Sequence, residues 1–212
     1  SHKMENVVVA GYNGLLGSAI TAYYETHKYR VIKIGYRPNI EHSDPNYKIV
    51  HFNNVHSIVS VLSGFKPVAI INCIGYTNVD LCEKFPDKSF EINSYIVRNL
   101  SYACQQLIGC KFIHISTDHL FGISQSYSSE ESKPDPLNVY AKSKLLGEDF
   151  ALKGSDNSLV LRTNFFGKSC VHKKSFSDTI LSSLASYSEL CLFNDAYFNP
   201  VSISSLCHFI HT

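Results

Sequence analysis

Two side chains that can act together on a proton, Tyr140 and Lys144, lie four residues apart. If this stretch is helical, they share one face, and the ammonium lies beside the phenol. A neighbouring cation lowers the pKa of a tyrosine, so the pair suits proton transfer at a sugar or steroid oxygen while hydride moves at the adjoining carbon. A tyrosine that simply packs on a lysine stem is the commoner explanation of this spacing alone, so the interpretation depends on the rest of the chain.

A glycine-rich turn near the amino terminus gives that support. Gly11, Gly14 and Gly17 follow an apolar run at residues 7–10 and precede a segment with helical spacing. Glycines let the backbone approach a pyrophosphate, and the amino terminus of the next helix presents N–H groups and a positive dipole end to that anion. The context predicts a dinucleotide-binding turn that includes Asn13 and Leu15, with a turn needed only for helix packing as the alternative.

Two later segments bear on the choice of cofactor. Where an acidic residue would pair with the ribose 2′-hydroxyl of NAD, the chain carries Arg37. A guanidinium can pair with a 2′-phosphate, which favours NADP over NAD, although a solvated loop arginine explains it nearly as well. Asn72, Cys73 and Gly75 end an apolar strand, where a glycine either leaves space for the cofactor or makes an ordinary turn.

The order of the elements explains how these residues come together. Strands are predicted at residues 7–10, 29–35, 49–52, 68–74, 111–116, 158–162 and 190–193, and helices at 18–29, 55–63, 87–109, 139–152 and 175–187. This alternation predicts an α/β fold, a doubly wound parallel sheet of the Rossmann type. Its ligand crevice would lie at the carboxyl ends of the strands.

Composition narrows the classes of function. The 212 residues, 44% of them hydrophobic, can bury one substantial core. A formal charge of +1 disfavours a nucleic-acid binder. No apolar run reaches the ~20 residues that span a bilayer and no signal peptide is evident, so we expect a cytoplasmic protein without membrane contact. The seven cysteines show no Cys-x-x-Cys spacing and predict neither a metal site nor a disulfide framework.

Several motifs occur in the order of one enzyme family. They are the glycine turn, NCIGYTNVDLCE at 72–83, Ile92-Asn93, ISTDHLF at 115–121, PLNVYAKSKLLGE at 136–148 and Arg162-Thr163-Asn164. With them the chain resembles extended short-chain dehydrogenase/reductases, and among these the dTDP-4-dehydrorhamnose reductases. The resemblance implies one NAD(P)-binding domain over residues 4–212. It also implies reduction of a 4-keto group on a nucleotide-linked deoxysugar. Residues 1–3 precede Met4 and are expected to be an expression-tag remnant.

The resemblance assigns roles to single residues. Tyr140 would be the general acid that protonates the carbonyl oxygen, and Lys144 would hold the nicotinamide ribose. Thr117 would donate a hydrogen bond to the same oxygen, with Ser116, at the cofactor end of that strand, as the other hydroxyl. Asn93 stands where the superfamily often has an asparagine that supports a proton-relay water, but a helix-surface amide is the simpler explanation.

The chain also departs from the family pattern. Residues 119–123 read HLFGI where these reductases commonly read YVFDG, so the sugar is left open. His119 would titrate near neutral pH, although a hydrogen-bonded structural histidine is more common. Asp118 is expected to be a turn residue and His114 buried scaffold. After a segment like residues 198–203 the family continues into a carboxyl-terminal substrate lobe, which we expect to be missing or shortened.

Three functions therefore remain. The first is the sugar-nucleotide reductase, and the second is an epimerase or dehydratase that recycles tightly held NAD, against which Arg37 argues mildly. The third is a non-catalytic NADP-binding regulatory subunit of another enzyme, which a shortened lobe favours. Helices at about 90–106 and 139–152 resemble those that pair subunits in this superfamily, so a homodimer is expected unless their apolar faces pack inside the monomer.

Overall fold

The computed structural model of the chain describes residues 3–38, 43–117, 138–163 and 193–196. The strands are β1 (Glu5–Ala10), β2 (Tyr29–Gly35), β3 (Tyr47–Ile49), β4 (Ala69–Asn72), β5 (Lys111–Thr117), β6 (Ser158–Thr163) and β7 (Phe193–Ala196). The α-helices are α1 (Leu15–Thr26), α2 (Val55–Leu62), α3 (Val79–Lys84), α4 (Pro86–Phe90), α5 (Ile96–Gln106) and α6 (Val139–Gly154). A 3-10 turn, η1 (Ser63–Phe65), follows α2, and a π-helical turn, η2 (Glu91–Tyr95), joins α4 to α5.

The seven strands form one sheet in the order β3-β2-β1-β4-β5-β6-β7. β1 to β6 pair in parallel, and β7 pairs antiparallel with β6. The chain moves outward in one direction from β1 to β3 and in the other from β4, so the strand order reverses between β1 and β4. In doubly wound folds this is where ligands bind, outside the carboxyl ends of the strands.

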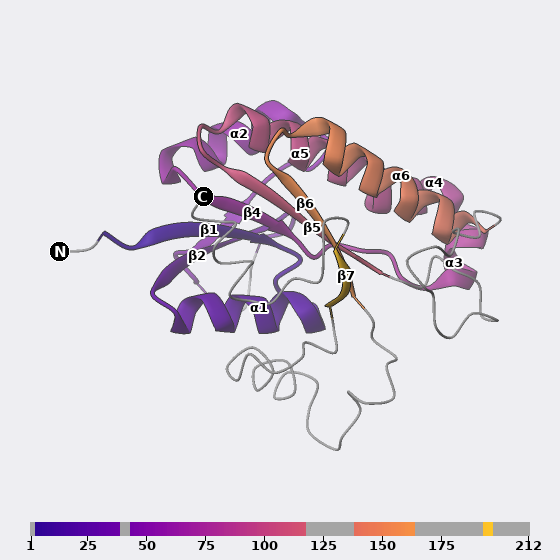
Figure 1. Cartoon of the computed structure of the whole chain (residues 1–212), viewed down its shortest axis with the longest axis horizontal. Coiled ribbons are helices and arrows are strands. Elements are labelled where there is room, and N and C mark those ends of the chain that lie inside the picture. Colours follow the sequence, from indigo (N-terminus) through magenta and orange to yellow (C-terminus); the bar gives the residue numbers. More distant parts are fainter. Residues whose placement is uncertain (1–2, 39–42, 118–137, 164–192, 197–212) are drawn as a thin grey trace, which may run out of the picture.

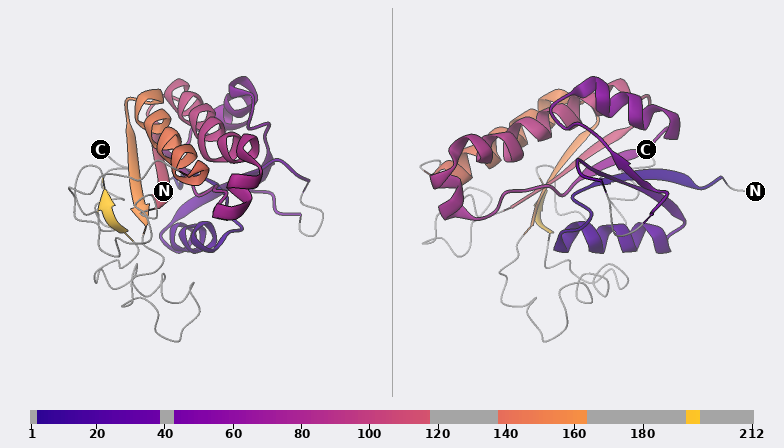
Figure 2. Two further views of the ribbon diagram at one scale, coloured as in Figure 1. Left: turned by 90° about the vertical axis from the view of Figure 1, so that its right-hand side faces the viewer. Right: turned by 180° about the vertical axis from the view of Figure 1, so that it is seen from behind.

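Helices cover both faces of the sheet. α1 lies against one face, while α2, α5 and α6 lie against the other (Figure 1), and Figure 2 shows the same two layers from other sides. Successive residues of β1 explain the arrangement, since Val7 and Val9 pack in the core with α1 and Val8 and Ala10 in the core with α2 and α5. Both sides of the strand are therefore apolar, as is usual for a buried parallel sheet.

Two predicted elements were displaced along the chain. The third strand lies at Tyr47–Ile49 instead of 49–52, because β2 ends at Gly35 and pairing stops with the bond from Val50 N to Gly35 O, 2.8 Å long. Burial of Val50 and Phe52, which follow the strand, produced the apolar pattern. α1 begins at Leu15 and ends at Thr26, earlier than the predicted 18–29. Of the last predicted strand, 190–193, only Phe193 lies within the described residues, where it begins the antiparallel strand Phe193–Ala196.

The single helix predicted at 87–109 is also wrong, because it is divided into α4, η2 and α5 and ends at Gln106. A short helix, α3, precedes it and was not predicted. The helix predicted at 175–187 and the segment at 198–203 lie outside the described residues.

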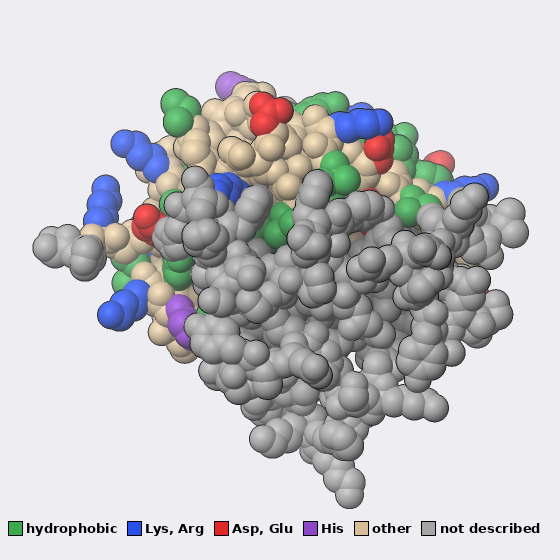
Figure 3. Space-filling model, in the orientation of Figure 1, with side chains coloured by type: hydrophobic (Ala, Val, Ile, Leu, Met, Phe, Trp, Pro, Cys, Tyr) green, Lys and Arg blue, Asp and Glu red, His purple; other side chains and the backbone are tan. Residues whose placement is uncertain are grey.

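The surface of the described residues carries charges of both signs. On the face shown in Figure 3, acidic and basic side chains are interspersed over the described surface. Among the helices of the described ranges, none is long and apolar enough to cross a membrane.

Candidate active site

The glycine turn between β1 and α1 is packed tightly against the end of β4. Gly11 has a φ of 78°, in the left-handed region, and a Cβ there would lie 2.8 Å from the backbone of both Cys73 and Ile74. A Cβ at Gly17 would overlap the carbonyl oxygen of Gly11. Two of the three glycines are therefore required by close backbone packing, which brings the turn beside the strand end where the sheet order reverses.

The first turn of α1 is open to an anion. Gly14 is the N-cap and has no side chain with which to satisfy the first N–H groups, and the first turn contains no acidic residue. Asn13 and Gly14 are exposed, and Leu15 begins the helix. Because the first four N–H groups of an α-helix have no partner within the helix, this end of the 12-residue α1 fits a pyrophosphate.

Asn72 joins the glycine turn to the centre of the sheet. It is fully buried at the end of β4; its Oδ1 accepts from Ile74 N at 3.1 Å, and its Nδ2 lies 3.1 Å from His114 Nδ1 on β5. Next along the chain, Cys73 N donates to Ala10 O at 2.8 Å.

Burial, and to a lesser degree the charge of Lys144, holds the pKa of His114 well below its ordinary value of 6.5. His114 is thus neutral scaffold, buried as predicted.

Beyond Cys73, the chain leads to the predicted catalytic pair. A Cβ at Gly75 would lie 3.7 Å from Lys144 Nζ and 4.0 Å from Asn93 Oδ1. The short segment Cys73–Gly75 therefore packs against the glycine turn at one end and lies near the amine of Lys144 at the other. Burial raises the pKa of the Cys73 thiol to about 12 against the opposing charge of Lys144, so this thiol stays protonated and is not a nucleophile.

Tyr140 and Lys144 lie one turn apart in the first half of α6, on the predicted shared face. The helix begins there because Asn138 caps it, with Oδ1 accepting from Ala141 N at 2.6 Å. Both side chains are buried, with 4% of Tyr140 and 3% of Lys144 exposed. Burial lowers the pKa of Lys144 to about 8, although the nearby Glu148 acts in the opposite direction. An amine with this pKa is mostly protonated at neutral pH and loses its charge as the pH rises through about 8.

Asn93 lies within this site, and its interpretation as a helix-surface amide was wrong. It is fully buried in the π-helical turn η2, with Oδ1 accepting from Tyr76 N at 2.8 Å and Nδ2 donating to Tyr76 O at 3.0 Å. The amide of Asn93 therefore binds both the N–H and the C=O group of Tyr76, the residue after Gly75. π-helical turns occur often at functional sites, because the extra residue redirects a side chain.

Serines that the motifs did not single out connect η2 to α6. Ser143 Oγ donates to Tyr140 O at 2.9 Å, accepts from Asn93 Nδ2 at 3.1 Å and lies 2.9 Å from Ser89 Oγ. Ser94 Oγ donates to Ser143 O at 2.6 Å. Sequence reasoning missed these residues because small hydroxyls carry no distinctive motif. The i, i+4 spacing of Ser89 and Asn93 was the available signal that both face the same neighbour.

The remaining predicted residues are placed less fully. Ser116 is buried near the carboxyl end of β5, and Thr117 ends that strand, paired through its backbone with Thr163. The side chain of Thr117 and the residues Asp118 and His119 lie outside the described residues. Arg37 follows β2 by two residues and is exposed, with its guanidinium carbon 5.0 Å from the ring centroid of Tyr36.

Comparisons with known proteins show the family of the chain. The family model described as the RmlD substrate binding domain matches residues 4–212. The chain belongs to this family. Similar solved structures include the dTDP-4-dehydrorhamnose reductase of Bacillus anthracis in complex with NADP, which is 29% identical, with a TM-score of 0.63 over 77% of this chain and 54% of that one. A hypothetical dTDP-4-dehydrorhamnose reductase of Sulfolobus tokodaii is 32% identical, with a TM-score of 0.62 over 74% of this chain and 55% of that one.

Curated relatives of this RmlD-family chain include a subunit of another enzyme and a reductase. Methionine adenosyltransferase 2 subunit beta of Bos taurus is 29% identical over 156 residues, which are 74% of this chain and 45% of that protein. The probable low-salt glycan biosynthesis reductase Agl14 of Haloferax volcanii is 29% identical over 196 residues, which are 91% of this chain and 65% of that protein. The chain therefore spans about half to two thirds of the length of these relatives.

Proposed function

We propose that this chain is the NADP-binding domain, over residues 4–212, of a reductase that converts a 4-keto group on a nucleotide-linked deoxysugar to an alcohol. The observation that supports the proposal is the proximity of three parts of the chain. The glycine turn packs on Cys73 and Ile74, and Gly75 lies near the amine of the buried Lys144. The turn that is proposed to bind the pyrophosphate and the tyrosine–lysine pair therefore lie on either side of the same short segment.

In this proposal the first turn of α1 binds the pyrophosphate of the cofactor, Arg37 pairs with its 2′-phosphate, and Lys144 binds the nicotinamide ribose. The hydride that the sugar carbon gains would come from the bound reduced dinucleotide. Tyr140 holds a proton for the carbonyl oxygen and releases it as that oxygen gains charge. The positive charge of Lys144 stabilises the phenolate that results. Thr117, or Ser116 beside it, donates a hydrogen bond to the same oxygen.

NADP is proposed over NAD for two reasons. The exposed guanidinium of Arg37 follows β2, where a 2′-phosphate group would lie in a doubly wound fold. The similar reductase of Bacillus anthracis was crystallised with NADP. NAD stays possible, because a ribose 2′-hydroxyl needs no cation.

Consumption of NADPH with dTDP-linked 4-keto deoxysugars tests the proposal directly. Wild-type protein should oxidise NADPH only when such a sugar is present. Tyr140→Phe should lower turnover about 10²- to 10⁴-fold with dinucleotide affinity nearly unchanged, since the ring remains and only the transferable proton is lost. Tyr102→Phe, on the exposed side of α5, is the matched control and should leave turnover unchanged. If the two variants retain equal turnover, Tyr140 is not the acid.

A second function is favoured by the similarity to methionine adenosyltransferase 2 subunit beta. On this alternative the chain binds NADP without turnover and acts as a subunit of another enzyme. NADPH would then titrate normally and no 4-keto sugar would be reduced. Tyr140→Phe would then leave NADPH binding unchanged. The activity of an added methionine adenosyltransferase would change in the presence of the chain. NAD that stays bound through purification would instead indicate an epimerase or dehydratase.

A further inference from the structure

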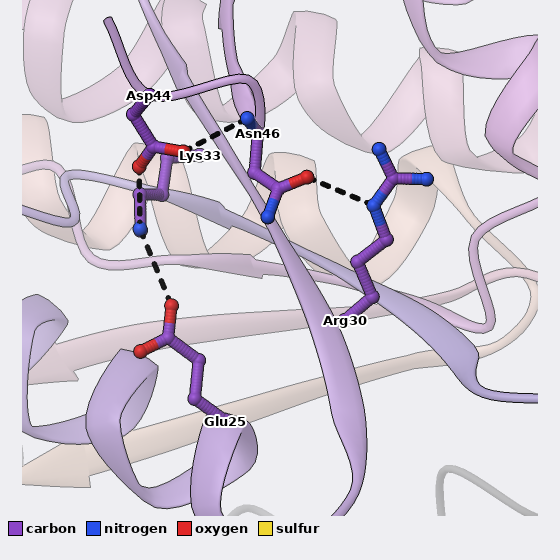
Figure 4. A network of polar contacts seen from close by, with 5 residues as sticks. All are labelled: Glu25, Arg30, Lys33, Asp44 and Asn46. Carbon is purple, nitrogen blue, oxygen red and sulfur yellow. Dashed lines mark hydrogen bonds and ion pairs between the residues drawn. The ribbon is translucent and has the colours of Figure 1, made fainter.

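A network of charged and amide side chains holds residues 44–46, which lie just before β3, against β2 (Figure 4). Lys33 of β2 pairs with Asp44 at 2.7 Å and with Glu25 of α1 at 3.2 Å. Asn46 N donates to Asp44 Oδ1, and Arg30 Nε donates to Asn46 Oδ1, both at 2.8 Å. Residues 44–46 are thereby fixed to β2 and α1, and they lead directly into Tyr47, the first residue of β3.

Tyr47 contacts three parts of the predicted cofactor end at once. Its phenol donates to the carbonyl oxygen of Arg37. Its ring lies so close to Gly35 that a Cβ on that residue would overlap the phenol. The same ring packs edge to face on Tyr12 of the glycine turn, with centroids 5.6 Å apart. One side chain therefore connects the backbone of Arg37 to the turn that is proposed to hold the pyrophosphate.

The guanidinium of Arg37 is available to a ligand. It is exposed and lies over the ring of Tyr36, and within the described ranges no carboxylate forms an ion pair with it. A guanidinium recognises phosphate best through two parallel hydrogen bonds, which require a fixed direction of approach. An arginine on a backbone free to shift would lose part of this pairing.

We propose that Tyr47 is the positioning residue that sets Arg37 for recognition of the 2′-phosphate of NADP, and so determines how strongly the site prefers NADP to NAD. This rests on the proposed function, in which Arg37 pairs with that phosphate. Tyr47 acts through the backbone: its phenol fixes the carbonyl of Arg37, and its ring fixes the distance to the glycine turn. Lys33 and Asp44 hold Tyr47 in place.

The consequence is selective for one cofactor. Tyr47→Phe keeps the ring, and with it the contacts to Tyr12 and Gly35, but removes the hydrogen bond to Arg37. NADPH affinity should fall roughly 3- to 10-fold, the value of one hydrogen bond, while NADH affinity should hardly change because NADH has no 2′-phosphate. Arg37→Ala should reduce the preference for NADPH by about 10- to 100-fold, since it removes a charge-assisted pair.

Equilibrium titrations of the full chain with NADPH and with NADH test the inference. The proteins are wild type, Tyr47→Phe, Arg37→Ala, the double variant, and Tyr102→Phe as a distant tyrosine control, each with its thermal unfolding recorded. If Tyr47 acts through Arg37, Tyr47→Phe lowers the ratio of affinities in the wild-type background and leaves it unchanged in the Arg37→Ala background.

The outcomes separate this inference from the function on which it rests. Wild-type protein that binds neither dinucleotide overturns the proposed function itself. A preference for NADPH that Arg37→Ala abolishes and Tyr47→Phe leaves intact overturns only the role of Tyr47. An equal loss of both affinities in Tyr47→Phe shows a general packing role and also overturns it. A preference that survives Arg37→Ala shows that another group recognises the phosphate, and the inference fails.

Discussion

At Gly147, α6 packs tightly on the backbone of the π-helical turn, and a single methyl group there should separate the two. A Cβ at Gly147 would overlap the carbonyl oxygen of Asn93 and lie 3.1 Å from its carbonyl carbon. Both neighbours are backbone, so no side chain can rotate away. The helices would have to move apart by on the order of 1 Å to restore ordinary contact, which strains the bond from Ser94 Oγ to Ser143 O, 2.6 Å long.

The expected loss of stability follows from three contributions. Overpacking costs about 1–3 kcal/mol, and weakening the hydrogen bonds between η2 and α6 adds about 1–2 kcal/mol. The higher helix propensity of alanine offsets about 1 kcal/mol of this destabilisation. The net destabilisation of Gly147→Ala is therefore about 1–4 kcal/mol.

Gly64→Ala is the matched control, because a Cβ at Gly64 meets nothing within 4 Å. It should leave the free energy of unfolding within about 0.5–1 kcal/mol of wild type, on the stabilising side. Urea unfolding followed by circular dichroism compares the two variants, and the slope of the transition shows whether both still unfold in one step. Equal midpoints for the two variants would refute the claim that α6 and the π-helical turn are held at backbone contact.

Three further predictions concern polar groups. Asn93→Ala should lower the free energy of unfolding by about 2–4 kcal/mol because it leaves buried backbone groups unpaired. Gln105 is an exposed amide, so the control variant Gln105→Ala should lower it by less than about 1 kcal/mol. Urea unfolding of the two variants compares these losses. NADPH affinity should fall as the pH rises through about 8, since Lys144, with its pKa lowered to about 8, is charged below that pH and neutral above it. Binding titrations with NADPH at a series of pH values check this, and an affinity that does not change with pH would contradict it. Asp44→Asn should cost less than about 1 kcal/mol because the pair with Lys33 is partly exposed. Lys33 and the backbone of Asn46 lower the pKa of Asp44 from 3.8. The extra stability of wild type over Asp44→Asn is therefore complete above about pH 4 and is lost as the pH falls through the lowered pKa.

Much of the fold could be predicted because it depends on patterns that are local in sequence. Apolar runs such as the one that ends at Asn72 indicate strands buried on both faces, and the glycines after β1 indicate a close backbone approach. Tyr140 and Lys144 were predicted on one helical face from their spacing alone, and the structure places both there, buried. Whether they perform the proposed chemistry stays a prediction.

The features that could not be predicted depend on contacts between distant segments. The π-helical turn is held by Asn93, whose partners Tyr76 and Ser143 lie 17 and 50 residues away. No propensity scale marks such a turn, because its stability comes from tertiary bonds. The contacts of Tyr47 were missed for the same reason, because its hydrogen bond to Arg37 O depends on how the chain returns from β2 to β3.

The π-helical turn has a consequence for chain length. Its hydrogen bonds close over one residue more than those of an ordinary helix, so α4 and α5 are out of phase with each other. Deleting any one residue from 91–95 should restore a regular helix and rotate the two halves against each other by about 100°. The buried amide at Asn93 and the packing of α5 on α6 could then no longer be satisfied together. A homologous chain with a one-residue gap at this position should therefore hold the loop after β4 by some other group.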